Sequence, residues 1–400
     1  MASKGCTVEK IQGLLVEKLE LYGGDYFTQI FNYLSKKSFV LLLDDVWEPL
    51  DLRQTGIPLP LGAVITKEKR KLIMTTRFLQ VCHSMDVHRS IRVECLRPEA
   101  ARLLFLEKVG EDAITSHPLI PKHANKVADE CDGLPLALIT IARAMAGNQA
   151  VEVWENTLRL LRTSKLSKVP GMDDPLPLLK VCYDYLKNPR EKECFLHCAL
   201  WPEDCKITKD ELIQCWMGHG LLEKFDDIQE AYNQGHAIVD SLHKACLLEH
   251  VNADYYELRN IHVKLHDVIR DMALWIAHDC GADEKKWVVL VGEDGEMLTD
   301  EKSWSKAHKM SLMFNEIITV PANIQRNPNL VTSIIHTAYS LTGSDIRPVQ
   351  NFHALTYLDL TNCKFLGNSF PIEICSLHML EYLNLPDTHI NSLPEVLKIF

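Results

Sequence analysis

The chain has 400 residues, of which 46% are hydrophobic and 24% are charged. This balance is typical of globular proteins and excludes wholesale disorder. At roughly 100–200 residues per domain, the length predicts two to four domains. The formal net charge of -11 excludes a general binder of the nucleic-acid backbone, because that mode of binding needs a basic surface.

The cysteines and the longest apolar stretches indicate in which cellular compartment the protein is expected and whether it spans a membrane. The 13 cysteines include no Cys-x-x-Cys pair, which predicts reduced, mostly buried thiols in a cytoplasmic protein. No stretch reaches the apolar length of a membrane-spanning helix, and the best candidate, at 133–147, is short and contains Arg143. We therefore expect a cytoplasmic chain without a membrane span.

The first segment alternates helices with short apolar strands. Apolar residues recur every three or four positions over 7–21, with Thr7 as the expected N-cap, and a second helical pattern covers 27–38. Apolar strands are predicted at 39–43, 71–77 and 91–96. This alternation is typical of an α/β domain.

From Arg97 onward the periodic segments are helical. Pro98 suits the first turn of a helix, and Gly133-Leu134-Pro135 separates two helical patterns. A stretch rich in Pro, Gly and Asp at 167–177 marks a domain boundary.

After that boundary the pattern predicts a winged-helix domain. Several helices are followed by a hairpin-like segment and a further helix at 268–277, and Thr208 and Glu211 form a capping box. No cluster of Lys and Arg lies on the helix that this box begins. The domain is therefore expected to be structural or regulatory rather than DNA-binding.

The last part of the chain contains an internal repeat. LVTSII, LTYLDL and LEYLNL begin at residues 330, 355 and 380, a spacing of 25, and a degenerate copy covers 307–321. Large apolar residues recur at the inward strand positions, which predicts leucine-rich repeats that bury their leucines against one another. The array is expected to be incomplete at Phe400.

Five segments stand in a characteristic order: FVLLLDDVW (39–47), KLIMTTR (71–77), CDGLPLAL (131–138), CFLHCALWPED (194–204) and LHDVIRDMALWIA (265–277). In turn they resemble the kinase-2 (Walker B), sensor, GLPL, winged-helix and Met-His-Asp motifs of the plant NB-ARC–leucine-rich-repeat disease resistance proteins of the coiled-coil class. Leu265 stands in place of the methionine. Any one motif is weak, but five in this order followed by repeats are specific to that family.

The resemblance implies a multidomain fold of the α/β plus α class. Its parts would be a P-loop NTPase-like parallel sheet at 1–95, a helical ARC subdomain at 96–171, a winged-helix ARC subdomain at 172–285 and the start of a leucine-rich-repeat solenoid at 286–400.

The resemblance also implies a nucleotide site for ADP or ATP with Mg²⁺. In the family the acid at Asp44 holds the metal and the acid at Asp45 polarises the attacking water, which would make Asp45 the catalytic residue. Arg77 would reach the γ-phosphate. The remaining nucleotide-binding residues implied are Gly133, Leu134 and Pro135 at the adenine and ribose, His266 at the β-phosphate of ADP, and Asp267 beside it.

Each of these positions also has a purely structural interpretation. Asp44 and Asp45 can be an acidic turn after a strand, and Arg77 a solvated residue at a strand end. Gly133 and Pro135 are helix breakers. His266 and Asp267 can be a capping pair, with Asp267 as the N-cap.

Cysteines and a histidine near position 200 raise the question of a zinc site. The residues concerned are Cys194, His197, Cys198 and Cys205. Their spacing lacks a Cys-x-x-Cys pair, which favours buried core thiols.

The sequence departs from the family in one respect. None of its 18 glycines is followed by lysine, so it contains no phosphate loop. We expect a chain truncated inside the nucleotide-binding domain, without the signalling domain. In the family's sheet, the phosphate-loop strand lies between two other strands, which correspond to segments 71–77 and 91–96 of this chain. We therefore expect 39–43 to pair with 71–75, 91–96 to lack a partner, and residues 1–95 to be least stable.

Two functions follow. The first is an intracellular immune receptor with an ADP/ATP switch, at most a slow ATPase, that oligomerises on activation. Its repeats would contact a pathogen effector, a guarded host protein, another receptor or the chain's own ARC domains. The alternative is a nucleotide-independent interaction or decoy protein, or the product of a degenerate gene.

Overall fold

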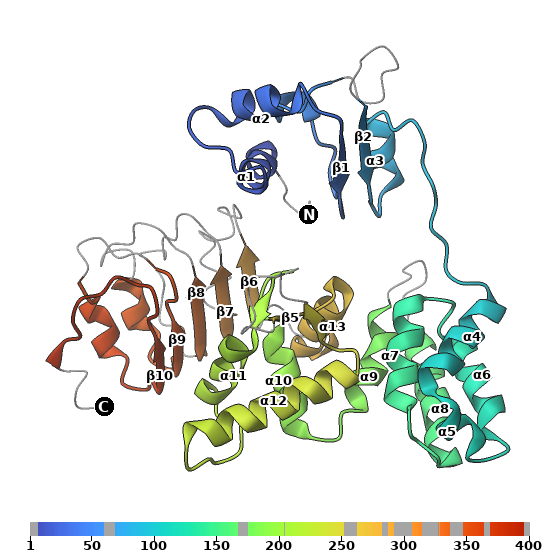
Figure 1. Ribbon diagram of the computed structural model, residues 1–400. Helices are drawn as coiled ribbons and strands as arrows, with labels where there is room; N and C mark the ends of the chain where they lie inside the picture. The colour runs from blue at the N-terminus through green and yellow to red at the C-terminus, as the bar shows by residue number, and fades with distance from the viewer. Residues whose placement is uncertain are drawn as a thin grey trace. The chain divides into compact units, whose positions relative to one another are not determined.

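The computed structural model describes residues 7–59, 69–166, 175–203, 205–251, 262–281, 287–291, 306–313, 327, 329–336, 347–363 and 369–395. The chain forms two compact units, Met1–Val93 and Glu94–Phe400. Each unit is described by itself below, with helices and strands labelled as in Figure 1.

The first unit is a two-stranded parallel sheet with helices packed beside it. Its elements are α1 (Val8–Lys18), α2 (Tyr26–Leu34), β1 (Phe39–Leu43), the 3-10 helix η1 (Leu52–Gln54), β2 (Arg70–Met74) and α3 (Leu79–Ser84). Thr7 caps α1 as predicted, because its side chain accepts a hydrogen bond from the Lys10 amide. Phe39 lies opposite Arg70, which confirms the predicted pairing of β1 with β2.

The two faces of this small sheet differ in burial. Leu43 and Leu72 belong to an apolar cluster on one face. On the strands' other side, Val40, Leu42 and Ile73 are 57%, 68% and 55% exposed. A parallel sheet ordinarily has both faces covered, so this face is unusually apolar for a surface.

The third predicted strand, at 91–96, is not present. The segment is extended chain without strand pairing, and Ile91 and Val93 are 73% and 92% exposed. The Leu96 amide donates instead to the carbonyl of Gly133 at 2.8 Å. An extended segment becomes a strand only where neighbouring backbone satisfies its polar groups, so the prediction of a strand is wrong here.

The second unit begins with a helical bundle. Its helices are α4 (Pro98–Val109), α5 (Glu111–Thr115), α6 (Ile120–Glu130), α7 (Pro135–Met145) and α8 (Val151–Leu166). Pro98 occupies the first turn of α4, as predicted, where its missing N–H costs no helical hydrogen bond. Helix α4 packs against α6 and α7, and α6 packs against α8. Phe105, Leu138 and Trp154 are fully buried between them.

A winged-helix arrangement follows. Its elements are α9 (Leu176–Asp184), α10 (Pro189–Cys198), β3 (Ile207–Thr208), α11 (Lys209–Gly218), α12 (Ile228–Lys244), β4 (Glu249–Val251), β5 (His262–Lys264), α13 (Asp267–Ala277) and the 3-10 helix η2 (Asp279–Gly281). The three strands form an antiparallel sheet in the order β3-β5-β4. Thr208 and Glu211 form the predicted capping box at the start of α11. Most of the predicted boundary at 167–177 lies outside the described residues.

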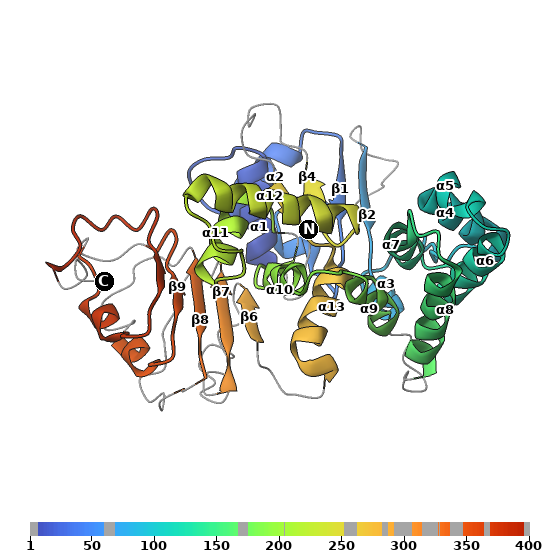
Figure 2. The same ribbon diagram turned by 90° about the horizontal axis from the view of Figure 1, so that it is seen from below.

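The unit ends in a five-stranded parallel sheet, visible in Figures 1 and 2. Its strands are β6 (Trp287–Val291), β7 (Lys309–Met313), β8 (Thr332–His336), β9 (Tyr357–Asp359) and β10 (Tyr382–Asn384), with 3-10 helices η3 (Arg347–Asn351) and η4 (Ile372–Ser376). Thr332 lies opposite Tyr357, and Tyr357 opposite Tyr382, so neighbours pair at the 25-residue spacing of the sequence. Strand β7 lies in the degenerate copy, of which 314–321 falls outside the described residues.

The two faces of this sheet belong to different cores. Leu312, Ile335 and Leu358 pack in a cluster formed by the repeats themselves. Residues at alternate positions, such as Ile334 and Tyr357, belong instead to the large core that also contains the winged-helix side chains. Because side chains of a strand point alternately to opposite faces, one face of the repeat sheet is covered by the chain's own winged-helix domain.

Candidate functional site

The carboxylates predicted to serve a nucleotide lie at one edge of the β1–β2 sheet. Asp44 and Asp45 follow β1, and the segment from Thr75 to Arg77 follows β2. The strands are parallel, with Leu43 opposite Met74, so both sets of polar side chains emerge at the same edge.

Thr75 joins the two strand ends. Its Oγ1 donates to Oδ1 of Asp44 at 2.5 Å and accepts the Asp45 amide at 2.8 Å. The Val46 amide donates to the Thr75 carbonyl at 2.9 Å, and the Thr75 amide to the carbonyl of Leu43 at the same distance. Asp45 itself has a positive φ of 52°, a conformation that Asp tolerates better than most residues. The turn after β1 is therefore held in one shape, with Thr75 as its positioning residue.

Asp45 and Arg77 pair with each other. Arg77 donates through Nε and Nη2 to the two carboxylate oxygens of Asp45, at 3.2 and 3.1 Å. The indole Nε1 of Trp47 donates to Asp45 at 2.7 Å, and the Arg77 guanidinium lies 4.8 Å from the centre of the Trp47 ring. A bidentate pair of this kind satisfies both oxygens of the acid. In this structure the predicted catalytic acid and the predicted phosphate-binding arginine are thus each other's partners.

The donors at this edge suit Mg²⁺ only in part. Asp44 and Thr75 offer hard oxygen donors of the kind that Mg²⁺ prefers, with the remaining positions normally filled by phosphate and water. Among the described residues, no group of three or more His, Cys, Asp or Glu side chains could hold a metal ion. Asp44 and Thr75 would therefore supply only part of the coordination shell of a Mg²⁺ ion that a nucleotide brings with it.

The Gly133 turn requires glycine for structural reasons. Gly133 has a φ of +72°, and a Cβ placed on it would lie 2.2 Å from the carbonyl oxygen of Leu96. Leu134 is the N-cap residue of α7, and Pro135 is its first helical residue. The interpretation as a helix break is confirmed, whereas contact with adenine and ribose stays a prediction.

His266 and Asp267 form a pair at the N-terminus of α13. His266 is the N-cap residue of α13, and the Val268 amide lies 3.3 Å from its Nδ1. Asp267 is the first helical residue, so its assignment as the N-cap is wrong, although its carboxylate also accepts the Val268 amide at 2.8 Å. The Asp267 carboxylate contacts Nδ1 of His266, and this hydrogen bond raises the pKa of His266. A raised pKa makes the imidazolium, which a phosphate prefers, more abundant near neutral pH.

The predicted site residues thus fall into local groups. Asp44, Asp45 and Arg77 meet in the first unit; the second unit contains the Gly133 turn and the His266–Asp267 pair. Thr75 and Trp47 are functional candidates that the sequence did not single out. The hydroxyls at the end of β2 were the available signal for Thr75.

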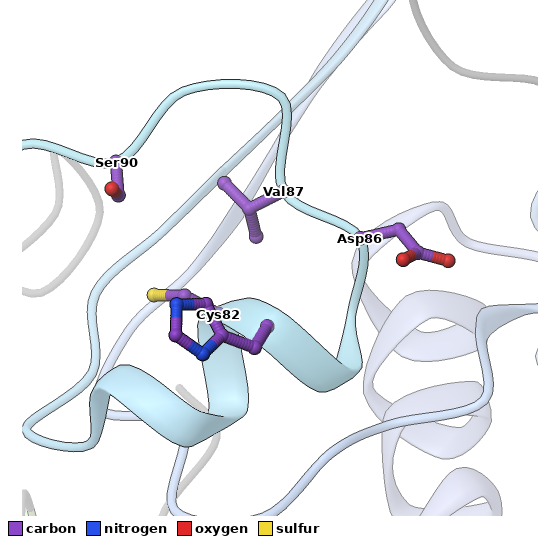
Figure 3. Close-up of a pocket in the computed structure, with 5 residues that line it drawn as sticks. Cys82, Asp86, Val87 and Ser90 are labelled. Atoms are coloured by element: carbon purple, nitrogen blue, oxygen red, sulfur yellow. The ribbon is translucent and has the colours of Figure 1, made fainter.

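A pocket of about 380 Å³ in the first unit is lined by Cys82, His83, Asp86, Val87 and Ser90. Figure 3 shows the side chains that surround it. A second pocket of about 790 Å³ lies between the end of α7 and the turn before α10. Neither pocket is lined by a predicted nucleotide residue.

The cysteines near position 200 belong mainly to the core, as predicted. Cys194 and Cys198 are fully buried, and the Cys198 thiol donates to the carbonyl of Cys194 at 3.3 Å. Burial raises the pKa of Cys198 well above its usual range, so this thiol stays protonated. Cys205 is only half-buried, and burial raises its pKa to about 12.

Two domain families match the chain. Residues 6–115 match the NB-ARC domain, and residues 200–273 match the disease resistance protein winged helix domain. The fold and these matches define an NB-ARC protein with a winged-helix subdomain. Within the described part of the chain, no helix is both long enough and apolar enough to cross a membrane.

Similar proteins agree with this class. The chain is 37% identical to Disease resistance protein SUMM2 of Arabidopsis thaliana over 404 residues, 98% of this chain and 44% of that protein. It is 37% identical to Disease resistance protein UNI of the same species over 409 residues, 100% of this chain and 44% of that protein. The chain thus contains NB-ARC and disease-resistance winged-helix domains and is similar over its whole length to disease resistance proteins, and it spans somewhat less than half the length of these relatives.

Proposed function

We propose that the chain carries an ADP/ATP-binding switch and part of a recognition surface of a cytoplasmic plant immune receptor. The nucleotide-binding, helical ARC, winged-helix and repeat regions would occupy 1–95, 96–171, 172–285 and 286–400. The switch binds nucleotide with Mg²⁺ and turns it over slowly at most. It responds to a pathogen effector, a guarded host protein or another receptor, and oligomerises on activation.

One observation carries the switch proposal. Asp44, Asp45 and Arg77 emerge together at the carboxyl edge of two parallel strands, inside the segment that matches the NB-ARC domain. In α/β folds, ligands bind beyond the carboxyl ends of the strands. Asp44 with Thr75 would face the metal, and Arg77 would exchange Asp45 for a phosphate oxygen.

The recognition surface would lie outside the covered face of the repeat sheet. Ile334, Tyr357 and Thr332 on that face are buried against the winged-helix domain. A partner protein would therefore meet the remaining surface of the repeats, or this face after a rearrangement. This favours the chain's own ARC domains as one occupant of the face.

A nucleotide-independent interaction protein is the second candidate. It is favoured by the mutual pairing of Asp45 and Arg77, which satisfies both side chains without a ligand. The two proposals differ in whether the β1–β2 edge binds nucleotide.

A titration of the whole chain with fluorescent ADP, with and without Mg²⁺, tests the proposal. The switch predicts binding that Mg²⁺ strengthens, and Asp44→Asn should abolish the Mg²⁺ effect because it removes a charged metal ligand. The matched control is Asp86→Asn, an exposed acid in the same unit, which should leave the effect unchanged. Absence of ADP binding in the folded chain would support the interaction protein.

A further inference from the structure

A group of buried titratable side chains lies between the winged-helix domain and the repeat sheet. We name it the histidine junction. Its members on α10 and α11 and in the turn after α11 are His197, Cys215, Gly218 and His219, and its members on β6 to β10 are Trp287, Lys309, Thr332, Tyr357 and Tyr382. All of these residues belong to the second compact unit.

The two histidines make matching hydrogen bonds. In each ring Nδ1 lies beside the carbonyl of the residue four positions earlier, Glu193 for His197 at 2.8 Å and Cys215 for His219 at 2.7 Å. A carbonyl only accepts, so Nδ1 carries the proton in both rings. In a neutral ring Nε2 is then an acceptor, and in both rings it faces a donor on the sheet.

The two donors on the sheet differ in whether they can accommodate a protonated histidine. Nε2 of His197 contacts the ammonium of Lys309, which has donors only, and Nε2 of His219 lies 2.9 Å from the hydroxyl of Thr332. A hydroxyl can rotate to accept a proton, whereas an ammonium cannot. Protonation of His197 would therefore place two donors and two positive charges against each other, while protonation of His219 would remain partly accommodated.

Aromatic packing leaves little room for relaxation. The His219 ring stacks on Tyr357 at 4.2 Å between centroids, and Tyr357 stacks on Tyr382 at 4.9 Å. His197 lies edge-on to His219 at 4.5 Å. A Cβ on Gly218 would come within 2.6 Å of the Tyr382 ring, so helix and sheet are in direct contact. Water cannot enter to solvate a new charge without opening the junction.

The charged surroundings do not compensate for added protons. Among the described residues, no carboxylate forms an ion pair with Lys309. The titratable groups around Lys309 and the two histidines are Glu193 on α10, Cys215 on α11, His336 on β8, Tyr357 and Asp359 on β9, and Tyr382 on β10. Asp359 is already engaged by His336, Thr361 and Asn384. Burial lowers the pKa of His197 well below its usual range and that of His219 to about 3.

We propose that His197 and His219 form a proton-sensitive latch that holds the winged-helix domain on the repeat sheet at neutral pH and releases it on acidification. Release exposes the sheet face that contains Ile334, Tyr357 and Asp359. The latch uses no nucleotide, so it stands independently of the switch proposed above.

The size of the effect follows from the linkage between protonation and opening. A histidine whose pKa is depressed in the closed form stabilises that form above its ordinary pKa of 6.5, and this stabilisation is lost as the pH falls below 6.5. Between about pH 7.5 and pH 5.5, each histidine that regains its ordinary pKa on opening raises the opening constant about 10-fold. The two together raise it about 100-fold.

Hydrogen exchange of the whole chain tests the latch. Exchange rates of amides in α11 and β8 are measured at about pH 7.5 and pH 5.5 and divided by their intrinsic rates, so that they report opening. Wild type should lose protection about 100-fold at the lower pH, while amides of α7, in the same unit but outside the junction, should not change. The double variant His197→Gln with His219→Gln, which keeps acceptors but does not titrate, should lose most of this pH effect.

Further variants keep the test decisive. His353→Gln removes an exposed histidine and should behave as wild type. If the double variant does not fold, the single variants His197→Gln and His219→Gln replace it, and each should reduce the pH effect about 10-fold. Equal protection of wild type at both pH values, or an undiminished pH effect in the folded variant, would overturn the latch.

Discussion

Replacing Lys309 by methionine should raise the free energy of unfolding relative to wild type progressively as the pH falls from 10. Burial lowers the pKa of Lys309 from 10.5 to about 8. Because the folded form binds its proton more weakly than the unfolded form, stability is lost as the pH falls from 10.5 toward 8. Methionine fills a similar volume and does not titrate.

The magnitude follows from the same two pKa values. Between about pH 10 and pH 7.5, the free energy of unfolding of Lys309→Met should rise relative to wild type by about 2 kcal/mol. The lost hydrogen bond to His197 lowers the variant's stability by a pH-independent amount of about 1 kcal/mol, so the pH-dependent difference is the diagnostic quantity. Urea unfolding of both proteins at several pH values measures it. A difference that stays constant with pH would refute the burial of a charged Lys309.

Three other predictions concern the rest of the fold. Gly133→Ala should lower the free energy of unfolding by more than about 2 kcal/mol, whereas Gly147→Ala, with a similarly positive φ but open space at its Cβ, should lower it by about 1 kcal/mol. Equal losses in urea unfolding would contradict the backbone clash at Gly133. A double-mutant cycle of Asp45→Asn and Arg77→Gln should give a coupling energy below about 1 kcal/mol, because both side chains are substantially exposed; a larger value would mean a structural role. Amides of β1 should exchange faster than those of β9 in native-state hydrogen exchange, since the first unit has only small apolar clusters in its described part; equal protection would refute its lower stability.

Local patterns in the sequence predicted much of the fold. The capping box of Thr208 and Glu211 is specified within four residues, and the 25-residue spacing reappears as the pairing of Thr332 with Tyr357. Parallel pairing of β1 with β2 was implied by the resemblance to the family's sheet. Strand β6 was missed because it lies outside that spacing.

Long-range partners could not be predicted in the same way. The bond between Asp45 and Arg77 joins residues 32 apart, and the bond between His219 and Thr332 joins residues 113 apart. Both depend on how whole elements pack, which no local pattern encodes. At α13 the prediction chose Asp267 as the N-cap because aspartate is the commoner cap, whereas the chain leaves β5 so that His266 takes that position.

The affinity of the whole chain for ADP, compared among variants of His266, tests the proposed switch most directly. His266→Asn keeps a side chain that can cap α13 but removes the imidazole, so it separates helix stability from ligand contact. Wild type should bind ADP with a dissociation constant below about 1 µM, and His266→Asn and His266→Ala should both weaken it roughly 10-fold or more through loss of a charge-assisted hydrogen bond. The exposed-site control His353→Ala should bind as wild type does. Failure of the folded wild-type chain to bind ADP, or equal affinity in all four proteins, would contradict a nucleotide switch controlled by His266.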